Sequence, residues 1–428
     1  MLNFLKELPS TPGIREAMAG VSQREENSLP VTDFSSGNVG KIVNNLQLFS
    51  NFQIEVNKEL IKPLRIISEA IKKGLLSSFY PIPDGLPYSP TGGTDSAKIL
   101  AMNYFRKFHG LPLSDDNLER VIVTAGGQQA LSASIKSIKS GTTIFMPRWE
   151  YSPVPELVKF NECQEKRIPI SDDLSFDVNF LKDIIKNDSV LYLSMPNNPT
   201  GYTSPKDLGA ISEIMLKNDG GVIWDAPYIF TILRLSPSKA IYDKKFQNEI
   251  LNDFKEIASE YYDNMCILSS LSKTCLLTGL RLGLATGPSK WIRSMNTIIS
   301  RDNISSPTTS FLIGIEALKL FINEPITHEW LCELVANRLT MLIEEELPLI
   351  LPKNGAYGAF YAIVRTKGMD GIKFSNELVK KFGIVTIPGN AFYGDEIDAV
   401  RVSLVTTPWS EDEQEWARNV RMFKKALE

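Results

Sequence analysis

The sequence predicts an α/β fold in which a mostly parallel sheet lies between helices. From about Pro90 onward, short apolar runs typical of strands alternate with longer segments of helical periodicity. Several runs are apolar at consecutive positions, which indicates strands that are covered on both faces. The strand candidates are Val121–Thr124, Thr143–Met146, Gln164–Ile168, Val190–Ser194, Gly221–Asp225, Met265–Ser269 and Leu280–Ala285.

Helical segments separate many of these strands, for example Pro205–Leu216 and Phe246–Tyr261. Beyond the last strand candidate the pattern changes, because Phe311–Asn323 and His328–Glu346 form long amphipathic patterns that Pro325 interrupts. The remaining candidates are a strand pair and helices, which predicts a second, α+β unit. They are Ala356–Arg365, Phe374–Phe382, Val400–Leu404 and Glu411–Ala426.

Composition limits the classes of function. The chain has 428 residues, 43% of them hydrophobic, so it can bury a large core in two or three structural units. Its net charge of −4, without a basic cluster, argues against a partner that is a nucleic acid or a membrane surface. No apolar run reaches the roughly 18 residues of a membrane span. Met1–Leu8 is too short and too charged for a signal peptide, so we expect a cytoplasmic protein.

Cysteine and histidine are both sparse. The four cysteines are scattered without a CxxC pair, which predicts free thiols in a reducing compartment. Only two histidines are present, His109 and His328, and this number argues against a histidine-based triad or a histidine-rich metal site. We therefore expect no metal. The cysteines are Cys163, Cys266, Cys275 and Cys332.

The most informative segment surrounds Lys273. This lysine follows an apolar run in a hydroxyl-rich stretch that contains Ser270 and Ser272, and Arg281 comes eight residues later. A lysine that forms a Schiff base with an aldehyde cofactor needs such a setting, and a cofactor phosphate needs hydroxyl groups and a guanidinium. Upstream, Gly127 and Gln128 stand at a strand-to-helix turn, where backbone N–H groups and the helix dipole favour an anion.

Two further motifs lie between the glycine turn and the lysine. Asn198 belongs to an Asn-Pro-Thr-Gly turn after Val190–Ser194, and Asp225 ends the next strand candidate three residues before Tyr228. Each motif alone is commonly an ordinary turn or a helix cap. In this order, with Lys273 behind them, they resemble the pyridoxal-phosphate-dependent aminotransferases of fold type I, class I and II, the aspartate aminotransferase-like group.

The resemblance implies the cofactor pyridoxal 5'-phosphate and a role for each motif residue. Lys273 would form the Schiff base and serve as the general base, and Asp225 would keep the pyridine nitrogen protonated so that the ring acts as an electron sink. Asn198 and Tyr228 would contact the phenolate oxygen. The phosphate would be bound by the backbone of Gly127 and Gln128 and by Ser270, Ser272 and Arg281.

Three more residues receive roles from the resemblance. Trp149, two residues after Pro147, would stack on the pyridine ring, with a core tryptophan or Tyr151 in the same role as the alternatives. Arg401 in an Arg-Val-Ser strand would form a fork on the α-carboxylate, or would be a surface arginine. Gly37 would contribute backbone contact to that carboxylate.

The resemblance also implies two domains and a homodimer with shared sites. Residues 1–60 would form an N-terminal arm and part of a small domain, residues 61–310 the large cofactor domain, and residues 311–428 the rest of the small domain, which both termini build. Tyr88 would reach the partner subunit's cofactor phosphate, or would pack locally. Arg301 is similar in context to an aspartate aminotransferase arginine that binds a distal carboxylate across the dimer. Its spacing from Lys273 is short for that subfamily, so an ordinary solvated arginine stays open.

The expected reaction is amino-group transfer from an amino acid to an α-keto acid by a ping-pong mechanism. A fold type I lyase or synthase that acts on one amino acid is the alternative, because the same site residues serve both reactions. A cofactor-binding regulator is a remote alternative, since the segment before Asp33 is too short for a DNA-binding domain. The sequence leaves the donor and the acceptor undetermined.

Overall fold

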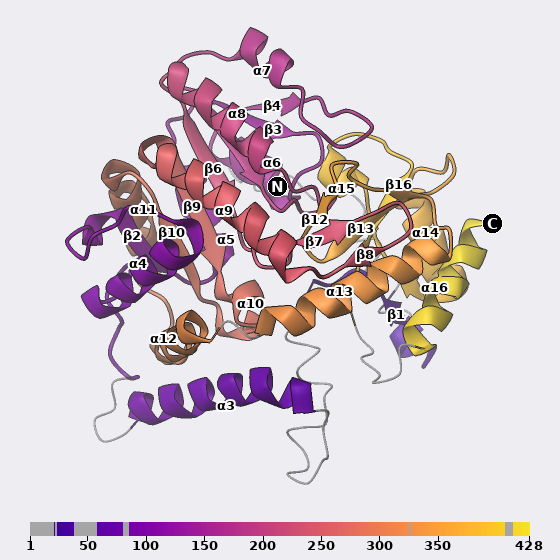
Figure 1. Cartoon of the computed structure of the whole chain (residues 1–428), viewed down its shortest axis with the longest axis horizontal. Helices are drawn as coiled ribbons and strands as arrows, with labels where there is room; N and C mark the ends of the chain where they lie inside the picture. Colours follow the sequence, from indigo (N-terminus) through magenta and orange to yellow (C-terminus); the bar gives the residue numbers. More distant parts are fainter. Residues whose placement is uncertain (1–20, 22–23, 38–57, 80–84, 325–326, 407–413) are drawn as a thin grey trace, which may run out of the picture.

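The computed structural model describes residues 21, 24–37, 58–79, 85–324, 327–406 and 414–428. Met1–Leu8, Pro325 and most of the range 9–29 lie outside these residues. A seven-stranded sheet forms the centre of the chain (Figure 1). Across the sheet the strands are β2 (Val121–Thr124), β10 (Gly283–Thr286), β9 (Met265–Ser270), β6 (Gly221–Asp225), β5 (Val190–Ser194), β3 (Thr143–Pro147) and β4 (Gln164–Ile168).

The sheet confirms the predicted fold class. Neighbouring strands from β9 through β6, β5 and β3 to β4 are parallel, and only β10 runs antiparallel to both of its neighbours. The expected strand Leu280–Ala285 begins three residues late, at Gly283. Leu280 still belongs to the short 3-10 helix η4 (Thr278–Leu280), and Arg281 has a φ of 53°, which is not strand geometry.

Helices cover both faces of this sheet and create two cores. On one face α5 (Gly127–Lys136), α6 (Pro153–Phe160) and α11 (Ser289–Asp302) pack against strand residues such as Ile144 and Ile223. On the other face their chain neighbours Phe145 and Trp224 contact a larger core. Side chains alternate across a strand, so runs that are apolar at every position serve both cores. The helices of the second face are α4 (Asp95–His109), α7 (Val178–Ile184), α8 (Pro205–Lys217) and α9 (Lys244–Glu260).

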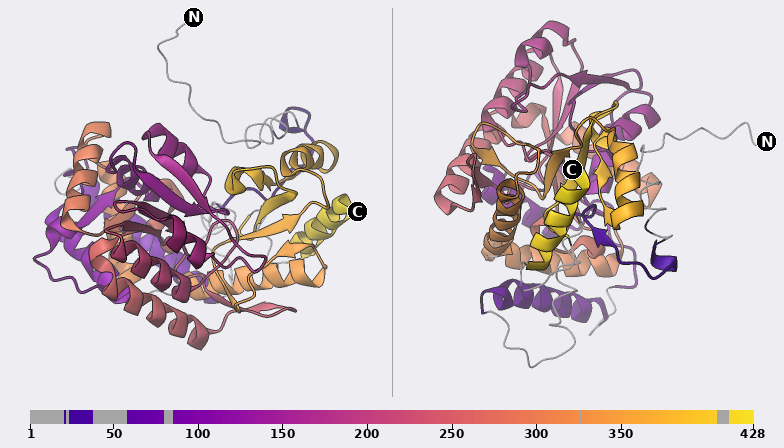
Figure 2. Two further views of the ribbon diagram at one scale, coloured as in Figure 1. Left: turned by 90° about the horizontal axis from the view of Figure 1, so that it is seen from above. Right: turned by 90° about the vertical axis from the view of Figure 1, so that its right-hand side faces the viewer.

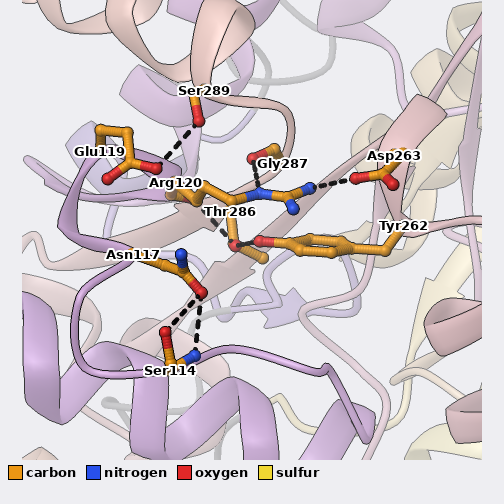
Figure 3. Close-up of polar contacts among 9 residues, drawn as sticks. All are labelled: Ser114, Asn117, Glu119, Arg120, Tyr262, Asp263, Thr286, Gly287 and Ser289. Carbon is orange, nitrogen blue, oxygen red and sulfur yellow. Dashed lines mark hydrogen bonds and ion pairs between the residues drawn. The ribbon is translucent and has the colours of Figure 1, made fainter.

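A cluster around Arg120 closes the edge of the sheet where β2 begins (Figure 3). Arg120 is the last residue of η2 (Leu118–Arg120). Its Nε donates to the Gly287 carbonyl at 3.1 Å, and its guanidinium lies 3.9 Å from the Tyr262 ring centroid. Thr286 Oγ1 donates to the Arg120 carbonyl at 2.9 Å and is 2.5 Å from the hydroxyl of Tyr262, the first residue of the 3-10 helix η3 (Tyr262–Asn264). These contacts join β2, β9 and β10 and secure the antiparallel register of β10.

The C-terminal part forms a second, antiparallel sheet with its own helices. Figure 2 shows these orange and yellow elements gathered on one side of the large sheet. The strand order is β11 (Leu349–Ile350), β13 (Tyr361–Arg365), β16 (Ala399–Ser403) and β15 (Ile387–Pro388). The helices are α13 (Thr327–Glu344), α14 (Gly371–Phe382), the short α15 (Asn390–Tyr393) and α16 (Gln414–Leu427).

Short strands connect distant parts of the chain. β1 (Thr32–Asp33) pairs in parallel with β14 (Ile384–Val385), so a segment near the N-terminus lies beside the C-terminal sheet. A three-stranded sheet places β7 (Leu233–Leu235) between β12 (Ala356–Tyr357) and β8 (Ala240–Ile241). The first pairing links the N-terminal segment to residues beyond 350, and the second links the central part of the chain to them.

The helices before β2 are absent from the sequence-based assignment. α3 (Lys58–Phe79) lies at the lower edge of Figure 1 and packs against α12 (Thr308–Asn323), which also contacts α4. α12 spans residues 310 and 311, and α3 spans residues 60 and 61, so both expected domain boundaries fall inside helices; the division stays a prediction. Among the described residues, no helix combines the length and apolarity needed to cross a membrane.

Candidate active site

A cavity of about 770 Å³ opens where the strands of the large sheet end, next to the C-terminal sheet. Ser194, Asp225 and Ser270 are the last residues of β5, β6 and β9, and all three line it. Ligands of α/β sheets bind at this edge. The predicted site residues that line the cavity are Gly37, Gly127, Gln128, Asn198, Asp225, Tyr228, Ser270, Ser272, Lys273, Arg281 and Arg401.

Lys273 extends into the cavity from α10 (Leu271–Thr274), a single helical turn directly after β9. Its Nζ donates a hydrogen bond to the carbonyl oxygen of Gly37, which belongs to the N-terminal segment. Burial lowers the pKa of Lys273, and the positive charges of Arg401 and Arg281 act in the same direction. A lysine with a lowered pKa is more often neutral, and the neutral amine is the nucleophilic and basic form.

An anion-binding cradle lies beside Lys273. Gly127 is the first residue of α5, so its N–H lies at the positive end of the helix. Arg281 Nη1 donates to Ser272 Oγ at 3.3 Å, and a Cβ on Gly126, which has a φ of 87°, would come within 2.6 Å of Arg281 Nη2. Only glycine allows this close approach. Backbone donors, hydroxyl groups and a guanidinium around one space fit a phosphate group.

Asp225 is a buried carboxyl group at the end of β6. The Tyr192 hydroxyl donates to its Oδ2 at 2.9 Å. Burial raises the pKa of Asp225 to about 7, and the hydrogen bond from Tyr192 opposes this rise. A carboxylate in this position is unfavourable until a positive group or a protonated nitrogen pairs with it. The environment therefore fits the protonated nitrogen of a pyridine ring.

Arg401 connects β16 to the opposite wall of the cavity. Its Nη1 donates to Asn198 Oδ1 at 3.0 Å and its Nη2 donates to the Ser35 carbonyl at 2.8 Å. The guanidinium carbon lies 4.0 Å from the centroid of the Tyr361 ring. Arg401 Nε is buried without a hydrogen-bond partner in the described part of the chain. A buried guanidinium with a spare donor fits a carboxylate ligand, so Arg401 is not a surface arginine.

Tyr361 is a cavity residue that sequence analysis missed. Its hydroxyl lies 3.1 Å from the Tyr228 hydroxyl, and a Cβ on Gly37 would fall only 1.9 Å from it. Burial raises the pKa of Tyr361, but the charges of Lys273 and Arg401 outweigh burial and lower it. The residue follows Phe360 at the start of β13, and no motif marks it. Its alternation with core residues along a strand was the only available signal.

The structure places Trp149 outside the cavity lining, so its stacking role stays a prediction. The indole is buried and lies 5.0 Å from the Tyr393 ring, centroid to centroid. Tyr151 lines the cavity instead, and its hydroxyl donates to Gln128 Oε1 at 3.2 Å. The physical reason is tertiary: α15 covers the segment after β3 and buries Trp149, so the next aromatic residue reaches the cavity.

Tyr88 and Arg301 also lie away from the cavity of their own chain. Tyr88 is 81% exposed, on a segment held by the hydrogen bond from the Ser89 N–H to Thr308 Oγ1, 3.0 Å long. Arg301 is exposed in the last turn of α11, not in a loop, and the neighbouring Asp302 pairs with Lys136. Within the described chain, both side chains are exposed and neither lines the cavity.

Comparisons with known proteins identify relatives of this chain. The model of the family "Aminotransferase class I and II" matches residues 63–413. The chain is 28% identical to an aspartate aminotransferase of Pyrococcus horikoshii over 352 residues, 80% of this chain and 83% of the relative. It is 24% identical to aromatic-amino-acid aminotransferase 2 of Thermococcus litoralis, over 79% of this chain and 82% of that one. A solved structure of Thermus thermophilus aspartate aminotransferase has the same fold, with a TM-score of 0.77, 20% identity, and coverage of 100% and 99%.

The raised pKa of Asp225 predicts a specific stability change in the cofactor-free protein. Because the folded-state pKa is about 7 and the ordinary value is 3.8, the folded state binds more protons between these values, and the free energy of unfolding falls as the pH rises through this window. Asp225→Asn removes this loss. Denaturant unfolding at about pH 8 should show the variant more stable than wild type by on the order of 2–4 kcal/mol, shrinking toward pH 4.

The exposed Asp253 of α9 provides the control for this measurement. Asp253→Asn should show no gain that depends on pH. Equal stability of Asp225→Asn and wild type at both pH values would contradict the assignment of Asp225 as a costly buried carboxylate.

Proposed function

Because the chain belongs to the class I and II aminotransferase family, we propose that it transfers an amino group from an amino acid to an α-keto acid with pyridoxal 5'-phosphate bound at Lys273. The observation that carries this proposal is the convergence on one cavity of Asp225, Arg401 and the segment that contains both Lys273 and Arg281. Members of this family use pyridoxal phosphate. The residues around the cavity fit that group at its phosphate, its ring nitrogen and its aldehyde.

When bound, pyridoxal phosphate supplies an electron sink that stabilises negative charge at the substrate's α-carbon. Asp225 would accept a hydrogen bond from the protonated ring nitrogen, and this pairing would relieve the cost of its buried charge. The Asn198 amide and the Tyr228 hydroxyl would bind the phenolate oxygen. Gly127, Gln128, Ser270, Ser272 and Arg281 would hold the phosphate. Tyr151 would make the aromatic contact expected from Trp149, because of these two residues only Tyr151 lines the cavity.

Two residues act on the substrate itself. The guanidinium of Arg401 would bind the α-carboxylate, with Asn198 and the backbone of Gly37 beside it. Lys273, once released from its covalent bond, would move the proton of the α-carbon as a general base, and its lowered pKa suits this task. The α-keto acid then accepts the amino group in the second half of a ping-pong cycle.

A homodimer would complete the site. Tyr88 would reach the partner's phosphate from a region rich in exposed apolar side chains, which monomers rarely leave in one place. The Gly85 N–H donates to the Ser78 carbonyl at 2.7 Å, so the end of α3 and the segment before Tyr88 are neighbours. A second copy of the chain is the proposed occupant of this surface. Its exposed members are Leu75, Leu76, Phe79, Leu86, Tyr88 and Ile304.

The amino donor depends on residues beyond this cavity. Among the described lining residues the cations are Lys273, Arg281 and Arg401, and each already has a role. A distal carboxylate, as in aspartate, would therefore need another cation. We assign this task to the partner subunit's Arg301, which the exposed position of Arg301 permits. A cytoplasmic location is also a proposal, supported by four cysteines that are all free and buried.

Lys273 is the residue that tests the proposed function. Lys273→Ala should lose amino transfer by several orders of magnitude, as removal of a covalent catalyst does. Borohydride reduction of the wild-type holoenzyme should fix the cofactor on Lys273, as peptide mass spectrometry can show. Lys290→Ala on the surface of α11 is the matched control and should transfer normally. Label on another lysine, or turnover of one amino acid without any keto acid, would contradict the proposal; the second result would indicate a lyase.

The dimer is tested by charge placed on its proposed surface. Wild type should sediment at twice the chain mass of 47.9 kDa. Leu76→Asp combined with Leu86→Asp should weaken association by roughly 2 kcal/mol or more per substitution and lower cofactor affinity. Leu216→Asp, an exposed leucine on α8, should leave the mass unchanged. A fully active wild-type monomer would rule out the shared site.

Donor selectivity tests Arg301. The ratio kcat/KM should be measured for aspartate and for an uncharged donor in wild type and in Arg301→Ala. Loss of the partner's guanidinium should damage aspartate selectively, by on the order of 2–5 kcal/mol of transition-state stabilisation, since a distal carboxylate would be left unpaired. Arg293→Ala, on the same helix, is the control. Equal small losses for both donors would show that Arg301 does not bind the substrate side chain.

A further inference from the structure

Glu150 is a fully buried carboxyl group behind the cavity wall, between Trp149 and Tyr151. Its Oε1 accepts a hydrogen bond from the Ser194 hydroxyl. The same oxygen accepts from the Tyr151 N–H, at a distance of 2.8 Å. Its Oε2 accepts from the Ser194 N–H at 3.0 Å and from Asn197 Nδ2 at 3.4 Å. Glu150 is the acceptor in each of these hydrogen bonds. Such an environment favours the ionised carboxylate, whereas burial opposes it and raises the pKa of Glu150 to about 8.

The Ser194 hydroxyl extends this contact to the cavity. Because Ser194 Oγ donates to Glu150, its lone pairs are free to accept from the Asn198 N–H at 3.1 Å and from Asn197 Nδ2 at 3.2 Å. Asn198 in turn accepts from Arg401. Glu150 therefore orients the hydroxyl that holds the backbone of the turn carrying Asn198. Replacing the carboxylate with a group that donates would set donor against donor at this point.

The carboxyl groups of Glu150 and Asp225 also interact through their charges. Ser194 and Asp225 are register partners in the β5–β6 pair, and the charge of Asp225 contributes to the raised pKa of Glu150. The other titratable groups that face Glu150 are Tyr151 from its own loop and Tyr192 from β5, whose hydroxyl is bound to Asp225. As the pH rises through about 8 and Glu150 ionises, its negative charge makes Asp225 a better acceptor for a proton that a ring nitrogen shares.

We propose that Glu150 is a positioning residue for amino-group transfer, which acts through Ser194 on Asn198 and through its charge on Asp225. It touches neither substrate nor cofactor, since it lies outside the cavity lining. The inference rests on the proposed function, because it assigns Glu150 a part in the same reaction. The resemblance to known aminotransferase motifs gave this position no role.

The test compares Glu150→Gln with wild-type holoenzyme. Glutamine keeps the shape and removes the charge. We expect kcat to fall about tenfold with a smaller change in KM, the size of effect that one pKa unit represents. We also expect the pH midpoint of the bound cofactor's absorbance change to move to lower pH, because the variant lacks the negative charge that Glu150 gains as the pH rises through about 8. Glu213→Gln on the exposed face of α8 is the matched control and should match wild type in both measurements.

Ser194→Ala and Glu150→Asp separate a positioning role from a folding defect. Ser194→Ala breaks the relay to Asn198 but keeps the carboxylate, so kcat should fall while the pH midpoint stays near the wild-type value. Glu150→Asp keeps the charge and should retain most of the wild-type midpoint even if Glu150→Gln fails to fold. The proposal is overturned if Glu150→Gln folds with an unchanged midpoint and kcat, or if Ser194→Ala is indistinguishable from wild type. The proposed function itself fails if wild type neither binds the cofactor nor transfers amino groups. The proposal for Glu150 fails alone if wild type is active and the variants match it.

Discussion

The contact between Arg401 and Asn198 is the interaction on which the geometry of the site depends. Arg401 belongs to β16 in the C-terminal sheet, and Asn198 belongs to the turn after β5 in the large sheet. Arg401 also binds the carbonyl of Ser35, which lies just after β1. A single guanidinium thereby joins three segments that are far apart in the sequence. Its burial is tolerated because donors on its fork meet fixed acceptors and two aromatic rings flank it.

Charge is concentrated around this contact. Lys273, Arg281 and Arg401 line one cavity, while Asp225 and Glu150 are buried along the adjacent strand ends. Burial pushes the pKa of Lys273 down and those of the two acids up, so each group is held away from its ordinary state. The cost falls on the folded protein without ligand. A ligand that carries a phosphate, a ring nitrogen and a carboxylate would pair with these groups and recover part of that cost.

The walls of the cavity come from different layers of the fold, and this explains its dependence on tertiary packing. The large sheet supplies strand ends whose direction is common to the parallel strands, so their terminal residues meet at one edge. The C-terminal sheet supplies Tyr361 and Arg401 from neighbouring antiparallel strands. The N-terminal segment supplies Gly37, whose missing side chain leaves room for the Tyr361 hydroxyl. Local sequence patterns describe each wall but not how the walls meet.

The sequence by itself determined the central strands and which motif residues surround the cavity. Val190–Ser194 and Gly221–Asp225 are strands over the residues expected, because consecutive apolar residues are a local property of buried parallel strands. The motif residues Asn198, Asp225, Lys273 and Arg281 came together for the same reason, since each stands a fixed short distance from a strand end. Local caps at Thr94 and Gly110 could also have revealed α4.

Only the tertiary structure decided the rest. Packing of α15 against the segment after β3 buried Trp149 and left Tyr151 in the cavity. Pairing between β13 and β16 brought Tyr361 beside Arg401, and the β5 end brought Ser194 to Glu150. These outcomes depend on contacts between residues tens to hundreds of positions apart. Periodicity and motif spacing carry information over one element and its adjoining turn, so they cannot determine which of two nearby aromatic residues a distant helix will cover.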